Sequence, residues 1–345
     1  QVHRVQMLMD QLLIASLPAP QDQWVADLNL TGGLNASGHV GVNPVTGKID
    51  FEIETDFSSA SANPFGKELL LEGIDGTCVI RSNGMTIHEL VAQTRGGTLH
   101  TEGTVNWGRQ LGNFDLHFKA QRITIDPTLL SVIPSHNLTG VSLHELIRVY
   151  QIQGVSDASL HLVHNDGDAG NHYRATLWPH SVSFDLHNQY IQLQDMSGEI
   201  HLQPGLIDLN NLIGHNKEGS FEASGYIRHT KPRETILNFS AAVDRLGLMA
   251  RSLLPEKLLG FIDYLHLDGA FTIQSGRLVL RPDAQEHPNL EFHSGIEVQG
   301  GTATVGVPIS DLYGTLDVAI TTRADFPWPD VSLSLNAERV RAAKR

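Results

Sequence analysis

Two histidine–glutamate pairs come closest to a known chemical motif in this chain. His88 and His144 are each followed by glutamate, as in the zinc motif HExxH of metalloproteases. In that motif a second histidine, one helical turn further on, binds the same ion. The corresponding residue is Ala92 in one segment and Arg148 in the other. We therefore expect no zinc-dependent hydrolase site at either pair.

The other histidines and acidic residues also form no recognisable metal motif. The chain has 18 histidines. His161 and His164 lie on a predicted strand with a spacing that puts their side chains on opposite faces, so they cannot share an ion. Residues 166–171 (DGDAGN) resemble the first half of a calcium loop, but its last ligand position is Leu177 instead of a bidentate glutamate. The sequence predicts ordinary surface histidines, a polar hairpin turn at 166–171, and no metal or other cofactor.

Motifs for other catalytic chemistry are missing as well. The glycines form no GxGxxG, GxxxxGK[ST] or GxSxG sequence, so dinucleotide binding, a phosphate loop and a serine hydrolase have no support. A polysaccharide-cleaving β-helix enzyme would need coils of about 20 to 30 residues and paired carboxylates. Neither feature is visible. We expect no catalytic residues and no enzymatic activity.

Charge and cysteine content narrow the choice of partners. The formal net charge is −14 with no basic stripe, so we expect no nucleic-acid partner. Cys78 is the only cysteine, which excludes an internal disulfide and a cysteine-based zinc site.

The longest apolar run, around residues 12–17, is shorter than the roughly 20 residues that cross a bilayer, and no signal peptide is recognisable. We expect any membrane anchor to lie in parts of the parent protein outside these residues.

The elements that would position a site are predominantly β-strands. The 345 residues include 32 glycines, and short apolar runs alternate with polar residues, as is typical of strands and turns. In residues 48–57, Ile49, Phe51 and Ile53 alternate with acidic residues. This alternation predicts a strand with one apolar face and one solvated face. A solvated face also explains the acidic residues without a bound cation.

These strands follow a sequence motif that occurs more than once in the chain. Residues 196–225 are predicted to form three strands joined by turns at 204–205 and 217–219, and residues 74–103 repeat the pattern. A third copy at 309–318 is shortened by a hairpin of about 20 residues. The matched positions are Gly76 with Gly198, Leu90 with Leu212, Gly97 with Gly219, and Gly103 with Gly225. The chain is thus one continuous repetitive segment, with repeats at about 1–120, about 121–243 and about 244–345.

Short amphipathic helices are predicted between the repeats, at residues 1–18, 127–133, 142–150 and 246–263. They are too few to cover a long sheet. We therefore expect a mostly β fold, an elongated antiparallel sheet that curls into a groove lined by apolar side chains. About 18 to 20 strands at about 4.8 Å each would give a length on the order of 90 Å. An array of β-sandwiches with closed cores is the alternative.

The order of these elements resembles that of a known family. The repeated motif begins with D-[apolar]-x-G-x-[apolar]-x-[apolar], which is followed by a glycine turn, a strand and a Gly-x5-Gly strand. It continues with LxFxA and a helix that ends in an apolar residue and proline. This order is similar to the C-terminal β-rich region of AsmA-like proteins, kin of TamB, and it covers most of the chain. The sequence departs from that family by lacking its N-terminal transmembrane helix and by shortening the third copy.

The resemblance implies a protein of the periplasm and cell envelope whose parent is anchored in the inner membrane. It further implies an elongated β-groove with a hydrophobic interior that serves outer-membrane biogenesis by conducting phospholipid. Our first functional hypothesis is such a non-enzymatic lipid groove, and the second is a structural or partner-binding array of β-sandwich domains. The candidate groove-lining residues are Phe51, Ile53, Leu116, Phe118, Ile200, Leu202, Phe221, Leu237, Phe239, Phe271, Ile273, Phe292 and Ile296.

Overall fold

The structure is a computed structural model of residues 1–345. It describes residues 2–8, 26–27, 29–107, 112–126, 129, 148, 151–243 and 263–342, apart from gaps at 43, 46, 48, 64–69, 166, 168–171, 187–188, 265, 267, 283–287, 306 and 323–329.

The described residues form a 17-stranded sheet. Its strands are β1 (Val2–Leu8), β2 (Thr31–Val42), β3 (Ile49–Ala62), β4 (Leu71–Arg81), β5 (Gly84–Thr94), β6 (Gly97–Asn106), β7 (Asn113–Ile125), β8 (Gln153–His164), β9 (His172–Leu186), β10 (Gln189–Gln203), β11 (Leu206–Asn216), β12 (Gly219–Arg228), β13 (Glu234–Val243), β14 (Asp268–Pro282), β15 (Pro288–Val305), β16 (Val307–Thr322) and β17 (Asp330–Ala342).

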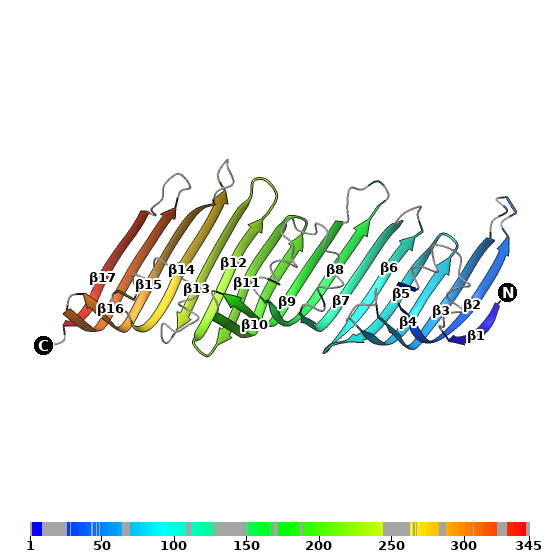
Figure 1. The fold of residues 1–345 in the computed structure, drawn as a ribbon, viewed down its shortest axis with the longest axis horizontal. Coiled ribbons are helices and arrows are strands. Elements are labelled where there is room, and N and C mark those ends of the chain that lie inside the picture. Colours follow the sequence, from blue (N-terminus) through cyan, green and yellow to red (C-terminus); the bar gives the residue numbers. More distant parts are fainter. Residues whose placement is uncertain are drawn as a thin grey trace.

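Each strand pairs antiparallel with the next strand in the chain, from β1 with β2 to β16 with β17. The order across the sheet therefore follows the order in the sequence, and the two chain ends lie at opposite ends of the molecule (Figure 1). The prediction of a mostly β protein with an antiparallel sheet is confirmed. The expected 18 to 20 strands are slightly too many for the described residues.

The predicted three-stranded motif at residues 196–225 corresponds to β10, β11 and β12. Its predicted turns are also present, at residues 204–205 and 217–218. Asn216 forms the second turn because its side-chain oxygen accepts hydrogen bonds from the backbone N–H groups of Glu218 and Gly219, at 2.8 and 3.1 Å. A short polar side chain that bonds to its own backbone two residues on is a strong local turn signal.

The predicted helix at residues 1–18 is wrong at its start, where the chain forms β1. Leu8 pairs with Gly33 and Val2 with Gly38, so β1 extends the edge of β2. Pairing with an available edge supplies ladder hydrogen bonds, whereas an isolated helix of this length is marginal in water. The predicted helices at 127–133 and 142–150 lie almost entirely outside the described residues. Of the predicted helix at 246–263, only Asp263 is described, and it is helical.

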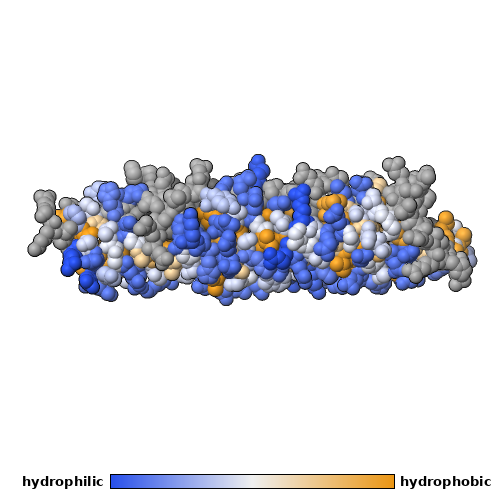
Figure 2. Space-filling view, turned by 90° about the horizontal axis from the view of Figure 1, so that it is seen from below, coloured by the Kyte–Doolittle hydropathy of each residue, from blue (hydrophilic) through white to orange (hydrophobic). Residues whose placement is uncertain are grey.

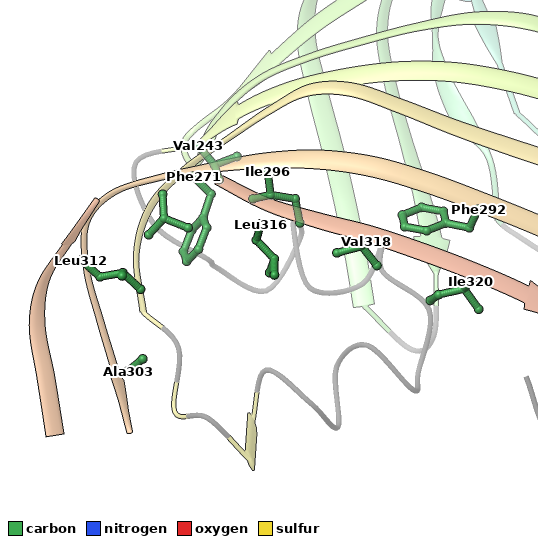
Figure 3. Packing of buried hydrophobic residues seen from close by; sticks show 10 residues of the cluster. Val243, Phe271, Phe292, Ile296, Ala303, Leu312, Leu316, Val318 and Ile320 are labelled. Carbon is green, nitrogen blue, oxygen red and sulfur yellow. The ribbon is translucent and has the colours of Figure 1, made fainter. Parts of the chain in front are cut away.

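Several strands contain a β-bulge at which a non-glycine residue adopts a positive φ. Ser59, Arg122, Asp195, Asn211 and Asp311 have φ values between 47° and 54°, each at a shift in strand register. A bulge adds one residue to one strand and bends it. The bend is visible in the close view of the C-terminal strands (Figure 3).

The hydrophobic core is distributed along the sheet as three clusters. The first spans β12–β17 around Phe271 and Phe292. The second spans β3–β5 around Ala60 and Ile74, and the third spans β8–β12 around Leu202. The strand registers place all three clusters on the same face of the sheet. Among the described residues, no helical segment has the length and apolar character needed to cross a bilayer.

Candidate functional site

The candidate site is the face of the sheet that carries the three core clusters, which we term the apolar face. Side chains alternate between the two faces along a strand, and residues directly opposite each other on neighbouring strands share a face. Leu116 on β7 lies opposite Leu162 on β8, and Phe118 lies opposite Leu160. Such apolar pairs continue from strand to strand, so the apolar face runs along the sheet without a change of side.

All of the groove-lining residues predicted from the sequence lie on the apolar face. This follows from the unbroken chain of strand registers between β3 and β15. They are Phe51 and Ile53 on β3, Leu116 and Phe118 on β7, Ile200 and Leu202 on β10, Phe221 on β12, Leu237 and Phe239 on β13, Phe271 and Ile273 on β14, and Phe292 and Ile296 on β15.

The predicted residues of the C-terminal strands pack most tightly. Phe271, Phe292 and Ile296 are between 2% and 5% exposed. Phe239 and Ile273 are partly buried against them, as is Phe221 of the same predicted set. Figure 3 shows the labelled side chains from β14, β15 and β16 together on the inner side of the bent strands. This part of the apolar face is therefore a packed hydrophobic core.

The middle of the apolar face is packed less completely. Leu202 is buried and forms a cluster with Tyr173 and Ile207, and Ile200 packs against this cluster from the same strand. Burial raises the pKa of the Tyr173 phenol to about 12. The hydroxyl is thus held in its neutral form in an environment of low polarity.

The other predicted residues lie outside the three clusters and are half-buried. They are Phe51, Ile53, Leu116, Phe118 and Leu237. Phe51 and Ile53 lie at the opposite end of β3 from its cluster members Ala60 and Ala62. On β2, Phe51 lies opposite the exposed Val40 and Ile53 lies opposite Gly38, so both have little to pack against on that side. The predicted lining residues therefore change from half-buried on β3 and β7 to closely packed on β14 and β15.

Sequence reasoning missed the contribution of β16 to this face. Leu316, Val318 and Ile320 are at most 6% exposed and belong to the C-terminal cluster, together with Leu312. The signal was present in the sequence, since these residues alternate with Asp317 and Ala319 as a half-buried strand should.

The opposite face of the sheet is polar. Arg81 donates to Glu52 on the neighbouring strand at 2.7 Å, and Arg281 pairs with Glu234 at 2.6 Å. Seen from below, the molecule is largely hydrophilic with separate hydrophobic patches (Figure 2). The predicted division into an apolar and a solvated face holds for β3, whose Glu52 and Glu54 are exposed.

A shallow hollow lies on this polar face and not on the apolar face. It measures about 660 Å³ over β12–β17. Most of its lining comes from outward-facing small or polar residues, such as Ser240, Arg277, His293 and Asp317. It is open and shallow, with no buried catalytic pair, so we assign it no chemistry.

Cys78 is the one thiol in the chain, and it lies on the apolar face with 1% of its surface exposed. Desolvation by burial, with a smaller effect from the charge of Asp56, raises its pKa to about 12. The thiolate is the nucleophilic form of cysteine. A thiol that stays protonated and out of solvent is unsuited to nucleophilic catalysis.

His161 and His164 lie on opposite faces of β8, as the sequence predicts. His164 stacks on Phe114, whereas His161 contacts the Asp115 carboxylate, and these two neighbours point to opposite faces of β7. Ligands from a neighbouring strand were not predicted from the sequence. Within the described residues, Asp115, His117 and His161 form a group that could hold a metal ion.

No protein-family model, no curated protein and no solved structure matches this chain.

Proposed function

We propose that this chain is a non-enzymatic segment of an AsmA-like envelope protein that shields the acyl chains of phospholipids on its apolar face. The observation that carries the proposal is the continuity of that face, which keeps the same side of the sheet from β3 to β16. A sheet that curls around this face would form a groove that protects apolar chains from water and leaves the headgroups outside.

The physical basis of such binding is the hydrophobic effect. Each methylene removed from water contributes about 0.8 kcal/mol, without any specific chemistry. Phe118 and Leu116 are half-buried, so part of their apolar surface is still exposed and could contact a lipid chain. The polar face, with its ion pairs, would remain in solvent.

The length of the sheet supports a role in spanning part of the distance between two membranes. With 17 strands at about 4.8 Å each, the sheet would extend over roughly 80 Å. In keeping with the resemblance, we place the parent protein in the periplasm, anchored in the inner membrane by residues outside this chain. There the groove would conduct phospholipid towards the outer membrane, and the copies of about 120 residues would be its repeating unit.

The direct experiment is gentle purification followed by lipid extraction and mass spectrometry. We expect phospholipid to copurify with the chain. Phe118→Asp and Phe239→Asp should lower the ratio of lipid to protein, because a carboxylate on the apolar face is costly to desolvate. Lys119→Asp and Asn238→Asp place the same side chain one residue away on the exposed polar face and should leave the ratio unchanged. Absence of lipid from the unmodified chain, or equal ratios in all four variants, would count against the proposal.

The alternative is a structural or partner-binding array of β-sandwich domains. The uninterrupted pairing of consecutive strands favours the groove, since sandwiches would divide the strands between separate packed sheets. Small-angle scattering distinguishes the two hypotheses. We expect a single elongated particle, and a string of compact lobes would support the sandwich array.

A further inference from the structure

A second cluster of interest lies on the polar face, on the side of the sheet away from the proposed lipid groove. Asp115 and His117 alternate along β7, so they point to the same side. His161 on β8 lies directly opposite His117 in the strand register. Residues far apart in the sequence are thus brought together by rigid, fully paired strands.

The potential ligand atoms of these residues converge on one point. Oδ1 of Asp115 lies 2.8 Å from Nε2 of His161 and 3.3 Å from Nε2 of His117. The two imidazole rings are stacked, with 4.0 Å between centroids and 12° between planes. The ligand atoms of all three residues lie within 4.8 Å of one another. Both rings therefore direct the same nitrogen towards the same carboxylate.

This donor set matches a borderline divalent cation. Zinc binds imidazole nitrogen at about 2.0 to 2.1 Å and carboxylate oxygen at about 2.0 to 2.2 Å. Two ligand atoms of one tetrahedral ion are therefore roughly 3.3 Å apart. The separations around Oδ1 of Asp115 are already close to that value. A zinc ion would need small side-chain rotations and no movement of the strands.

A further ligand is available beside the cluster. Glu102 on β6 lies directly opposite His117 in the register. It lines the same shallow hollow of about 350 Å³ as Asp115 and His117. The hollow is open to solvent, so water can also complete the coordination. Two imidazoles, one carboxylate and an open position make a three-ligand site rather than a closed structural one.

Other histidines on the strands pair with an acid but have no such convergence. His180 lies 3.1 Å from Asp157, and His201 lies 3.0 Å from Glu199. Within the described residues neither pair belongs to a group of three metal-binding side chains. These pairs provide internal controls for a surface rich in histidine.

We propose that Asp115, His117 and His161 bind one Zn²⁺ ion on the polar face of the sheet, with Glu102 or water as the fourth ligand. The site does not depend on the lipid function. Copper and nickel ions share the preference for imidazole, and Cu²⁺ would bind more tightly by the general order of divalent affinities.

Isothermal titration with Zn²⁺ alone, on the full chain freed of metal, tests the proposal. We expect one site above the background of weak surface binding. His117→Ala and His161→Ala should each lower its affinity at least about tenfold, since loss of an outer-shell partner alone typically costs 10- to 100-fold. His161→Gln, which keeps the bulk of the side chain, should have the same effect.

The matched control is His201→Ala, which removes a histidine paired with a single acid and should leave the affinity unchanged. Circular dichroism of each variant shows whether the sheet is intact. The proposal is overturned if the unmodified chain shows no site above background, or if folded His117→Ala and His161→Ala proteins bind Zn²⁺ as the control does.

Discussion

The ring of Phe239 on β13 stacks on the ring of Phe292 on β15, although β14 runs between their strands. The ring centroids are 6.0 Å apart and the planes are inclined by 30°. The contact is possible because Phe239 lies opposite Gly276 of β14, where no side chain intervenes. A Cβ atom at Gly276 would lie 2.3 Å from the Phe239 ring. A glycine thus allows two aromatic rings to meet across an intervening strand.

Replacing this glycine should destabilise the C-terminal cluster. In Gly276→Ala the added methyl group would push the Phe239 ring away from Phe292, and overpacking of this kind typically costs about 1–3 kcal/mol. Urea unfolding, followed by tryptophan fluorescence and circular dichroism, measures the loss. Gly41→Ala is the control, because a Cβ there meets nothing within 4 Å. Equal stability of the two variants would show that the stacked pair has room to move.

The buried thiol should titrate and react only when the sheet opens. Burial raises the pKa of Cys78 from 9.0 to about 12. A raised pKa means that its contribution to stability is fully present below the unfolded value and is lost as the pH rises from about 9 towards about 12. At pH 8 we expect a thiol reagent to modify the native chain far more slowly than the chain unfolded in urea. Rapid modification of the native protein would show that β4 opens locally.

Asp157 should stabilise the bulge on the adjacent strand. Its Oδ1 accepts a hydrogen bond of 2.7 Å from the backbone N–H of Arg122, which has a φ of 54°. This bond, followed by the interaction with His180, lowers the pKa of Asp157. A lowered pKa means that the stabilisation is present above the unfolded value, near pH 4, and is lost as the pH falls through the folded value.

Asp157→Asn should therefore be less stable than the unmodified chain at pH 7, by about 1 kcal/mol or less because the carboxylate is partly exposed to solvent. The difference should shrink as the pH falls below about 4, because the native carboxyl group takes up its proton as the pH falls through its lowered pKa. Unfolding curves at pH 7 and at a series of lower pH values provide the measurement. A difference that does not change with pH would assign the effect to side-chain packing instead of to the charge.

The alternation of apolar and polar residues predicted the strands and their common face well. Ile200 and Leu202, for example, lie on the predicted face because the period of two is a local property of the strand. The turn at residues 217–218 was also predictable, from Gly219 and its polar neighbours. Alternation cannot show how tightly a residue packs, so Phe292 and Phe51 looked alike in the sequence although only Phe292 is fully buried.

Features that depend on pairing between distant residues were not predictable. His117 and His161 meet because β7 pairs with β8 in one particular register, which neither segment encodes alone. Ser59 and Arg122 are ordinary residue types with no signal for a positive φ. Their backbone N–H groups are bound by Asp75 and Asp157 of the adjacent strands, at 2.9 and 2.7 Å. These two bulges are therefore stabilised by hydrogen bonds from the adjacent strands.

The predicted repeat remains a prediction, although parts of it have matching geometry. Strands β5 and β11 each have 11 residues, and β6 and β12, which follow them, each have 10. Gly76, Gly198 and Gly314, which the repeat aligns, all have positive φ values. In the third copy β16 pairs directly with β17, as expected if a hairpin is missing there.

The order of the strands has a mechanical consequence. Each strand is hydrogen-bonded to the strands that precede and follow it in the chain, and the termini lie at opposite ends (Figure 1). Tension applied between the two ends would therefore pass through every hairpin in series. Stability in such an arrangement is a sum of nearest-neighbour terms, as in a one-dimensional chain of coupled units. The sheet would yield by peeling strand after strand from its edges, and the tightly packed C-terminal strands would resist longest.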